Sequence, residues 1–284
     1  MMKPTFSILI PTWNNLSYLK LCIESLCKHS DEQHQLIIMV NEGADGTLDW
    51  VTSQPYVEYV ASPENIGICY GLNACRPLIK HPYVVYANDD MYFLPHWDTR
   101  LSEAIEQAAT DEFMLSATMV EPRGDNACCV IADFGDSLEN FREEDLLKAA
   151  PDLVREDWSG STWPPVLLPL PLWDKVGGLS IEFSPGMYSD PDLSRKLWEC
   201  GVRHFQGVGG SLVYHFGCKS TGRIKQNKGR HTFLMKWGLS AHRFMHDYLQ
   251  IGAPFKARLP EVHTSGWRRF IGKVKLINTI ITGK

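Results

Sequence analysis

The chain has 284 residues, of which 44% are hydrophobic and 21% charged, and its formal net charge is −5. This is the composition of an ordinary globular protein that is long enough to bury a sizeable core. No run of 18 or more apolar residues occurs, and the N-terminal segment is too short and too early interrupted by Pro11 for a signal peptide. The eight cysteines form no CxxC pair, so we expect reduced thiols in a cytosolic protein.

Charge is distributed unevenly along the chain. Residues 219–284 contain 14 of the 28 Lys and Arg residues but only two acids, Asp247 and Glu261, which gives +12, whereas residues 1–218 carry −17. The C-terminal part is therefore expected to meet something anionic, such as a phosphorylated ligand, a membrane surface or nucleic acid. The acidic remainder of the chain argues against nucleic acid.

Short apolar runs alternate with helical patterns over the first 120 residues. The pattern predicts strands at 6–10, 35–40, 57–61, 83–88 and 113–120, and helices at 16–30, 47–53, 68–80 and 97–109. Such alternation indicates an α/β fold, with a mostly parallel central sheet and helices on both faces. After residue 121 the alternation becomes less regular, and a proline-rich extended segment follows at 164–171. The pattern then predicts a helix at 190–201 and a strand at 210–215.

The fourth predicted strand ends on Asn88, Asp89 and Asp90. Ligands of α/β sheets bind outside the carboxyl ends of the strands, so these side chains are expected in the binding crevice. Adjacent carboxylates repel each other, and partial burial makes their ionisation costly, so we expect a cation beside them. The alternative is that the two acids cap the next turn.

Six segments resemble the motifs of a known family in their order and spacing. They are FSILIPTWNN, VNEGADGT, SPENIGICYGLNACR, ANDDM, YSDPDLSRKLWECG and VYHFGCKST. Together they resemble family 2 glycosyltransferases, which are inverting enzymes of GT-A fold that use nucleotide sugars. The resemblance implies a GT-A domain over 1–240, with a nucleotide-binding half at 1–120 and an acceptor and catalytic half at 121–240. A basic helical C-terminal extension would follow at 241–284.

The resemblance implies a divalent metal on the diphosphate of the donor. Asp90 matches the last acid of the family's DxD motif and is expected to bind the metal, and His215 would complete the site. The first acid of that motif is Asn88 here, and Asn88 and Asp89 are expected to contact the donor. An imidazole ligand favours Mn²⁺ over Mg²⁺.

The resemblance also implies residues that bind the donor and a catalytic base. Asp190 matches the family's base, with Ser189 in place of the usual Glu, although either acid near this helix start would also suit capping. Lys219 and Arg223 are expected to reach the diphosphate, or else to form a solvated basic loop. Turn and capping roles are the alternative for the remaining donor-binding candidates, which are Pro11, Thr12, Trp13, Glu42, Asn65, Gly67 and Asn73.

Acceptor contacts are expected from Trp163, Trp173 and Asp192, because aromatic faces stack on sugars, although core packing is the alternative for each Trp. In the tail, residues 266–281 place apolar side chains at helical spacing with Arg and Lys mostly off that stripe. This pattern is typical of a helix on an anionic membrane, or of one packed on protein. We therefore expect a cytoplasmic protein, which would be peripheral on the inner face of a membrane if this helix binds the membrane rather than protein.

The sequence thus predicts a metal-dependent inverting glycosyltransferase of the hexosyl or deoxyhexosyl class. A UDP-sugar is the first choice of donor and a dTDP-sugar the second, and the acceptor is a hydroxyl of a glycan or lipid-linked glycan in polysaccharide biosynthesis. Two alternatives stay open. One is a non-catalytic nucleotide-sugar-binding protein of the same fold, and the other is a nucleotidyltransferase. The latter requires a Gly-rich phosphate loop after the first strand, where the sequence has PTWNN.

Overall fold

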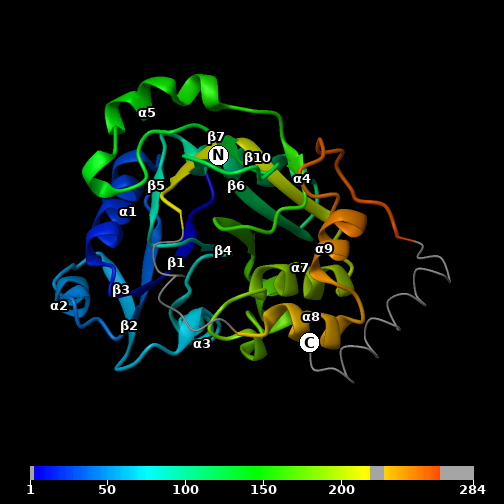
Figure 1. Cartoon of the computed structure of the whole chain (residues 1–284), viewed down its shortest axis with the longest axis horizontal. Helices are drawn as coiled ribbons and strands as arrows, with labels where there is room; N and C mark the ends of the chain where they lie inside the picture. The colour runs from blue at the N-terminus through cyan, green and yellow to red at the C-terminus, as the bar shows by residue number, and fades with distance from the viewer. Residues whose placement is uncertain (1–2, 218–226, 263–284) are drawn as a thin grey trace.

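The computed structural model describes residues 3–217 and 227–262 (Figure 1). The strands are β1 (Phe6–Trp13), β2 (Gln35–Asn41), β3 (Val57–Ser62), β4 (Tyr83–Tyr86), β5 (Met91–Phe93), β6 (Phe113–Glu121), β7 (Val130–Ile131), β8 (Trp158–Ser159), β9 (Val166–Pro169) and β10 (His204–His215). The helices are α1 (Leu16–His29), α2 (Thr47–Thr52), α3 (Gly67–Ala74), α4 (Trp97–Ala108), α5 (Glu143–Ala149), α6 (Leu170–Val176), α7 (Ser189–Glu199), α8 (Gly229–Trp237) and α9 (Ala241–Arg243).

The elements expected over the first 120 residues are present in the expected order, with one helix divided and one strand added, β5 at Met91–Phe93. The predicted helix at 68–80 is α3, which ends at Ala74, followed by a 3₁₀ turn at Arg76–Leu78. Pro77 accounts for the break, because proline lacks the amide hydrogen that would continue the helix. The predicted helix at 190–201 and strand at 210–215 are also confirmed, as α7 and the second half of β10.

The strands form one mixed sheet in the order β3-β2-β1-β4-β9-β6-β10-β5. The first four strands are parallel, as expected, and β10 is parallel to β6. In the second half β9 runs antiparallel between β4 and β6, and β5 runs antiparallel to β10. The proline-rich segment thus supplies a central strand, which the sequence did not predict. Pro165 and Pro169 lie at the two ends of β9, where a missing amide hydrogen interrupts the ladder least.

Helices cover both faces of the sheet, as expected for this fold class. Successive residues of β1 alternate between two cores: Phe6 and Ile8 pack with α1 and α4, whereas Leu9 packs with α3, α6 and α7. In Figure 1, α1 and α2 lie on one side of the molecule and α7 and α8 on the other. Phe244, which follows the expected boundary at residue 240, is buried in the core that contains α7. No helix in the described part of the chain is long and apolar enough to cross a membrane.

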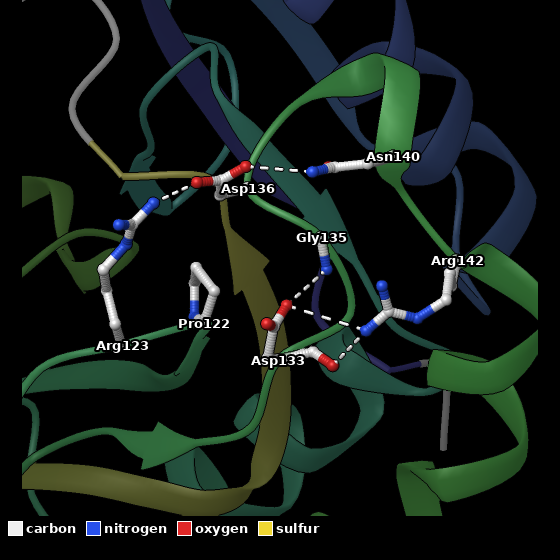
Figure 2. Close-up of a pocket in the computed structure, with 7 residues that line it drawn as sticks. All are labelled: Pro122, Arg123, Asp133, Gly135, Asp136, Asn140 and Arg142. Carbon is white, nitrogen blue, oxygen red and sulfur yellow. Dashed lines mark hydrogen bonds and ion pairs between the residues drawn. The ribbon is translucent and has the colours of Figure 1, made fainter.

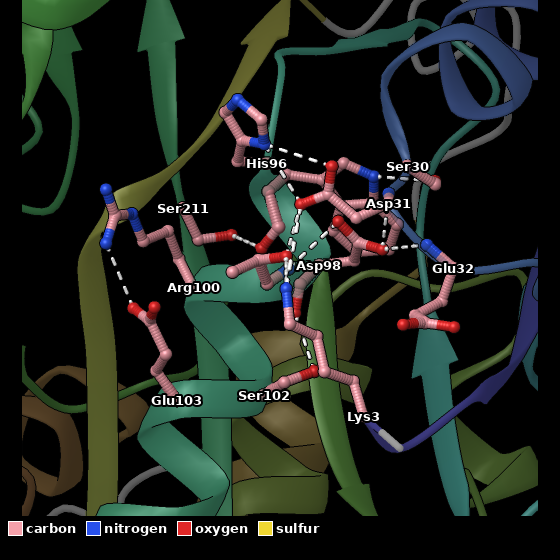
Figure 3. Close-up of polar contacts among 12 residues, drawn as sticks. Lys3, Ser30, Asp31, Glu32, His96, Asp98, Arg100, Ser102, Glu103 and Ser211 are labelled. Carbon is pink, nitrogen blue, oxygen red and sulfur yellow. Dashed lines mark hydrogen bonds and ion pairs between the residues drawn. The ribbon is translucent and has the colours of Figure 1, made fainter. Parts of the chain in front are cut away.

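A buried carboxylate ties the start of α4 to the loop that follows α1 (Figure 3). The Asp98 side chain is 1% exposed and accepts hydrogen bonds from the amides of Asp31 (2.9 Å) and Glu32 (3.0 Å), and its Oδ2 lies 3.1 Å from His34 Nε2. Burial disfavours the charged form, but the hydrogen bonds with His34 and the two amides outweigh it and lower the pKa of Asp98. This contact joins the amino end of β2 to α4, at the edge of the sheet opposite Asn88.

Asp98→Asn is expected to lower the free energy of unfolding at pH 7 by about 1–3 kcal/mol, because asparagine offers one acceptor oxygen where Asp98 uses two. A carboxyl group with a lowered pKa stabilises the fold above its unfolded-state pKa and loses that effect as the pH falls through the folded-state pKa. The deficit of the variant should therefore narrow below about pH 4. Denaturant titrations at pH 7 and pH 3.5 measure both values.

Glu103→Gln is the matched control, because Glu103 is half-exposed and pairs with Arg100 on the same helix (Figure 3). Its loss of stability should stay within about 0.5 kcal/mol. A deficit in Asp98→Asn that is equally small, or one that does not change with pH, would contradict the interpretation.

Candidate functional site

Three strand ends and one helix start surround a cavity of about 640 Å³. Its polar lining includes Asn88 after β4, Glu121 at the end of β6, His215 at the end of β10 and Asp190 in the first turn of α7. Its apolar lining includes Trp163, and the remaining wall is rich in methionine and proline. Segments far apart in the sequence thus meet at the carboxyl edge of the sheet, where α/β folds bind their ligands.

Asp90 and His215 lie side by side, and His215 lines this cavity. Both side chains are almost fully buried, with 4% and 5% exposure, and Asp90 Oδ1 is 3.5 Å from His215 Nε2. The backbone sets this proximity: the amide of Phe216 donates a hydrogen bond of 3.1 Å to the carbonyl of Asp90, and His215 pairs with Met91 across β10 and β5. The turn after β4 is therefore fixed against the end of β10.

Glu121 is a polar residue of the cavity that the sequence did not predict. Its Oε1 lies 2.8 Å from His215 Nδ1, on the opposite side of the ring from Asp90. The available signal was an acid that ends a buried apolar run, the same signal that singled out Asp90. It was missed because the alternating pattern and the resembling motifs both stop short of this position.

The pair Asp90 and His215 fits part of a metal site. Among residues 3–217 and 227–262, no group of three or more His, Cys, Asp or Glu side chains has the arrangement of a complete site. A carboxylate oxygen and an imidazole nitrogen 3.5 Å apart are close to the roughly 3 Å between neighbouring ligands of one cation. Cations that act on phosphates commonly take only one or two protein ligands and complete their shell with phosphate oxygens and water. The donor set present suits this arrangement.

Asp190 lies on the cavity wall in the first turn of α7, where its neighbour Ser189 donates a hydrogen bond to the carbonyl of Gly186 (2.7 Å). No side chain caps α7 by a hydrogen bond, so the capping alternative for Asp190 is not seen. Burial raises the pKa of Asp190 to about 7. A carboxylate with such a pKa gains a proton readily near neutral pH, which is the property a general base requires.

The end of β1 and the loops after β2 and β3 hold most of the donor-binding candidates. Trp13 Nε1 donates a hydrogen bond to Glu42, and Asn65 Oδ1 accepts one from the amide of Gly67 (2.9 Å). Gly67 has φ +76°, and a Cβ there would lie 2.6 Å from Cα of Pro185, a cavity residue. Only glycine fits this close approach between the nucleotide-binding candidates and the cavity wall. Pro11 and Thr12 lie in β1, where both are buried.

Asn73, another donor-binding candidate, is engaged by the backbone. Its amide nitrogen donates a hydrogen bond to the carbonyl of Leu179 (2.7 Å), and its amide oxygen accepts one from the Leu179 amide (2.9 Å). These bonds fasten α3 to the loop after α6. A role for Asn73 in donor binding stays a prediction.

The three acceptor candidates lie in different places. Trp163 lines the cavity, whereas Trp173 is a residue of α6 that is 2% exposed and packs in the core. Asp192 is fully buried and contacts Lys236 (3.0 Å) and Trp237 (2.7 Å) of α8. The predicted diphosphate residues Lys219 and Arg223, and the basic segment 266–281, lie outside the described residues.

A second cavity of about 360 Å³ adjoins the end of β6 (Figure 2). Two ion pairs, Arg123 with Asp136 and Arg142 with Asp133, line it and offset each other's charge. Tyr214, the neighbour of His215 on β10, donates a hydrogen bond to the carbonyl of Gly135 (2.6 Å) in the same loop. The loop after β7 is thereby fastened to the strand that carries His215.

Solved structures with the same fold come from glycosyltransferases. S. aureus TarS (residues 1–349) is 12% identical, with a TM-score of 0.58 over 82% of this chain and 64% of that one. GalNAc-T7, crystallised with UDP, GalNAc and Mn²⁺, is 12% identical, with a TM-score of 0.56 over 80% of this chain and 44% of that one. The mannosyltransferase PcManGT from Pyrobaculum calidifontis, in complex with GDP-Man and Mn²⁺, is 12% identical, with a TM-score of 0.54 over 100% of this chain and 77% of that one. The chain thus spans less than two thirds of the first two relatives.

These relatives define the class: the protein has the GT-A fold of nucleotide-sugar glycosyltransferases, as expected. Residues 7–126 match the family model described as Glycosyl transferase family 2. The resemblance to family 2 glycosyltransferases is thereby confirmed. A comparison with curated protein sequences gave no match.

Asp190→Asn is expected to stabilise the fold above about pH 4, with the full effect reached near pH 7. For an acid whose folded-state pKa is raised to about 7, the stability present at low pH is lost as the pH rises through this value. The variant has no carboxyl group to ionise. Its melting temperature should therefore match that of the wild type near pH 4 and exceed it increasingly up to about pH 7.

The exposed residue Asp125 provides the control, because Asp125→Asn makes the same chemical change on the surface. Melting curves of both variants from pH 4 to pH 8 measure the effect. A constant difference between Asp190→Asn and the wild type across this range would show that the carboxyl group is not raised in pKa by burial.

Proposed function

We propose that the protein is a metal-dependent inverting glycosyltransferase that moves a sugar from a nucleotide diphosphate to a hydroxyl group of an acceptor. The observation that carries this proposal is the meeting of two kinds of group at one cavity. The Asp90 and His215 pair adjoins it, and Asp190, a carboxyl group with a pKa of about 7, lines its wall. The family match and the GT-A fold support it.

Asp90 and His215 would hold the divalent cation, Mn²⁺ in preference to Mg²⁺, because one ligand is an imidazole. When bound, the cation offsets the charge that develops on the departing diphosphate. Asn88 at the cavity and the adjacent Asp89 would contact the donor. The linked pair Trp13 and Glu42, beyond the cavity, would hold the nucleobase.

Asp190 would take the proton of the acceptor hydroxyl as that oxygen attacks the anomeric carbon. In a direct displacement the acceptor oxygen attacks the anomeric carbon from the face opposite the diphosphate. The bond between this carbon and the diphosphate breaks, and the configuration of the carbon is inverted. The ionised form of Asp190 is required, and its pKa of about 7 makes this form abundant at and above neutral pH. The apolar cavity wall, including Trp163, limits water, which would otherwise compete as acceptor.

The donor is proposed to be a UDP-sugar, with a dTDP-sugar as second choice, and the sugar a hexose or deoxyhexose. The acceptor would be a glycan or lipid-linked glycan made during polysaccharide biosynthesis. TarS has been crystallised with UDP-GlcNAc and PcManGT with GDP-Man, which supports the nucleotide-sugar class.

Binding of 266–281 to an anionic membrane stays a proposal from the sequence, and liposome co-sedimentation with and without this segment tests it.

Thermal stability with UDP, dTDP, GDP or CDP, each with and without Mn²⁺, tests the donor class. A ligand at 100 times its dissociation constant stabilises the native state by about 2.7 kcal/mol, which gives a melting shift of several degrees. We expect a shift with UDP that requires Mn²⁺ and disappears in Asp90→Asn. Absence of a shift with all four nucleotides would refute nucleotide binding. A shift of equal size without Mn²⁺ would refute the requirement for a metal in nucleotide binding.

Asp190→Asn is expected to lower turnover by about 10²–10⁴-fold while the UDP-induced melting shift is retained. Release of UDP from UDP-sugars by slow transfer to water provides the assay. In the wild type, kcat/KM should rise with pH up to about 7 and then level off, since the carboxylate form is the active one. Turnover that survives in Asp190→Asn would assign the base elsewhere. Wild-type binding of UDP without turnover on any UDP- or dTDP-sugar would favour a non-catalytic binding protein.

A further inference from the structure

Glu121 contacts the side of the His215 ring that faces away from Asp90. Glu121 Oε1 lies 2.8 Å from Nδ1, and Asp90 Oδ1 lies 3.5 Å from Nε2. All three residues are largely withdrawn from solvent: Asp90 and His215 are 4% and 5% exposed, and the Glu121 side chain is 18% exposed. The imidazole thus stands between two carboxylates that come from different strand ends.

A neutral imidazole carries one hydrogen and one lone pair on its two nitrogens, and its neighbours decide which nitrogen has which. An ionised carboxylate only accepts hydrogen bonds, so Glu121 holds the hydrogen on Nδ1. The lone pair is then on Nε2, which faces Asp90. A carboxylate in this position also makes the imidazole a better ligand, because it stabilises positive charge on the ring.

Glu121 is itself held in place from the far side. The thiol of Cys129, which is 7% exposed, makes a hydrogen bond with the Glu121 side chain. The amide of Ala132 donates a hydrogen bond of 2.9 Å to the Glu121 carbonyl, and Glu121 pairs with Ile131 between β6 and β7. Hydrogen bonds thus hold both the backbone of Glu121 and its carboxylate. A carboxylate held in this way can orient the His215 ring.

We propose that Glu121 is a positioning residue of the cation site, which sets the tautomer and orientation of His215 so that Nε2 and Asp90 bind the same divalent ion. This inference rests on the proposed function and deepens it. The sequence motifs do not include Glu121. The family match covers residues 7–126 but assigns no role to any residue, so the positioning role of Glu121 comes from neither source. The rival arrangement is an imidazolium that donates to both carboxylates and takes the place of a cation.

Titration of the full chain with Mn²⁺ by calorimetry, alone and with UDP, tests the proposal. Glu121→Gln keeps the size of the side chain but removes its charge, and it should weaken Mn²⁺ binding by about 10- to 100-fold. Glu144→Gln is the control, because Glu144 is an exposed residue of α5 and the charge change is the same. Its Mn²⁺ affinity should equal that of the wild type.

Pulsed electron paramagnetic resonance of bound Mn²⁺ supplies a readout that a general loss of stability would not produce. Nitrogen modulation from an imidazole ligand should be present in the wild type, absent in His215→Ala and reduced in Glu121→Gln. If Glu121→Gln does not fold, Glu121→Asp serves instead, since its shorter side chain breaks the 2.8 Å contact and keeps the charge. The same losses of affinity and of modulation are expected for it.

If the wild type binds Mn²⁺, and Glu121→Gln binds it with the same affinity and shows the same nitrogen modulation, this inference is overturned and the proposed cation site is not. Nitrogen modulation that is absent from the wild type, with Mn²⁺ bound, would show that His215 is not a ligand and would favour the imidazolium. No binding of Mn²⁺ by the wild type, with or without UDP, would overturn the cation site of the proposed function and this inference with it.

Discussion

The burial of two adjacent carboxylates at the end of β4 is the constraint on which the site depends. Asp89 and Asp90 are 5% and 4% exposed, and charges so close and so dry are costly without a compensating group. The end of β10 is held against this turn by the backbone hydrogen bond between Phe216 and Asp90 and by the pairing of β10 with β5. The same pairing places His215 beside Asp90, so the order of the strands also determines the geometry of the site.

The opposite edge of the sheet meets a similar constraint in a different way. Asp98 is as buried as Asp90, but backbone amides and His34 surround it, and its pKa is lowered. It serves to fasten α4 to the loop before β2. Asp190, at the cavity, has its pKa raised to about 7 by burial. Two buried acids of one protein are thus separated by their surroundings into a structural anion and a group that exchanges a proton near neutral pH.

Much of the first half of the fold follows from the sequence, because alternating apolar runs and helical stripes are local signals. The position of Asp90 at a strand end follows in the same way. The central place of β9 does not, because its partners β4 and β6 are chosen by long-range packing, and its flanking prolines obscure a four-residue strand. Glu121 ends a buried apolar run, but its contact with His215 spans 94 residues of sequence, and no local pattern records such a contact.

Asp190 and Asp192 illustrate the limit most sharply. Both lie in the first turn of α7, and helical spacing alone does not tell which carboxylate faces the cavity, although the family resemblance favoured Asp190. In the structure Asp190 lies on the cavity wall, while Asp192 turns inward to Lys236 and Trp237 of α8. These contacts hold the first turn of α7 against α8 and thereby fix the direction of Asp190. Asp192, which the sequence suggested for the acceptor, thus supports the first turn of α7 from the side of α8, behind the base that we propose.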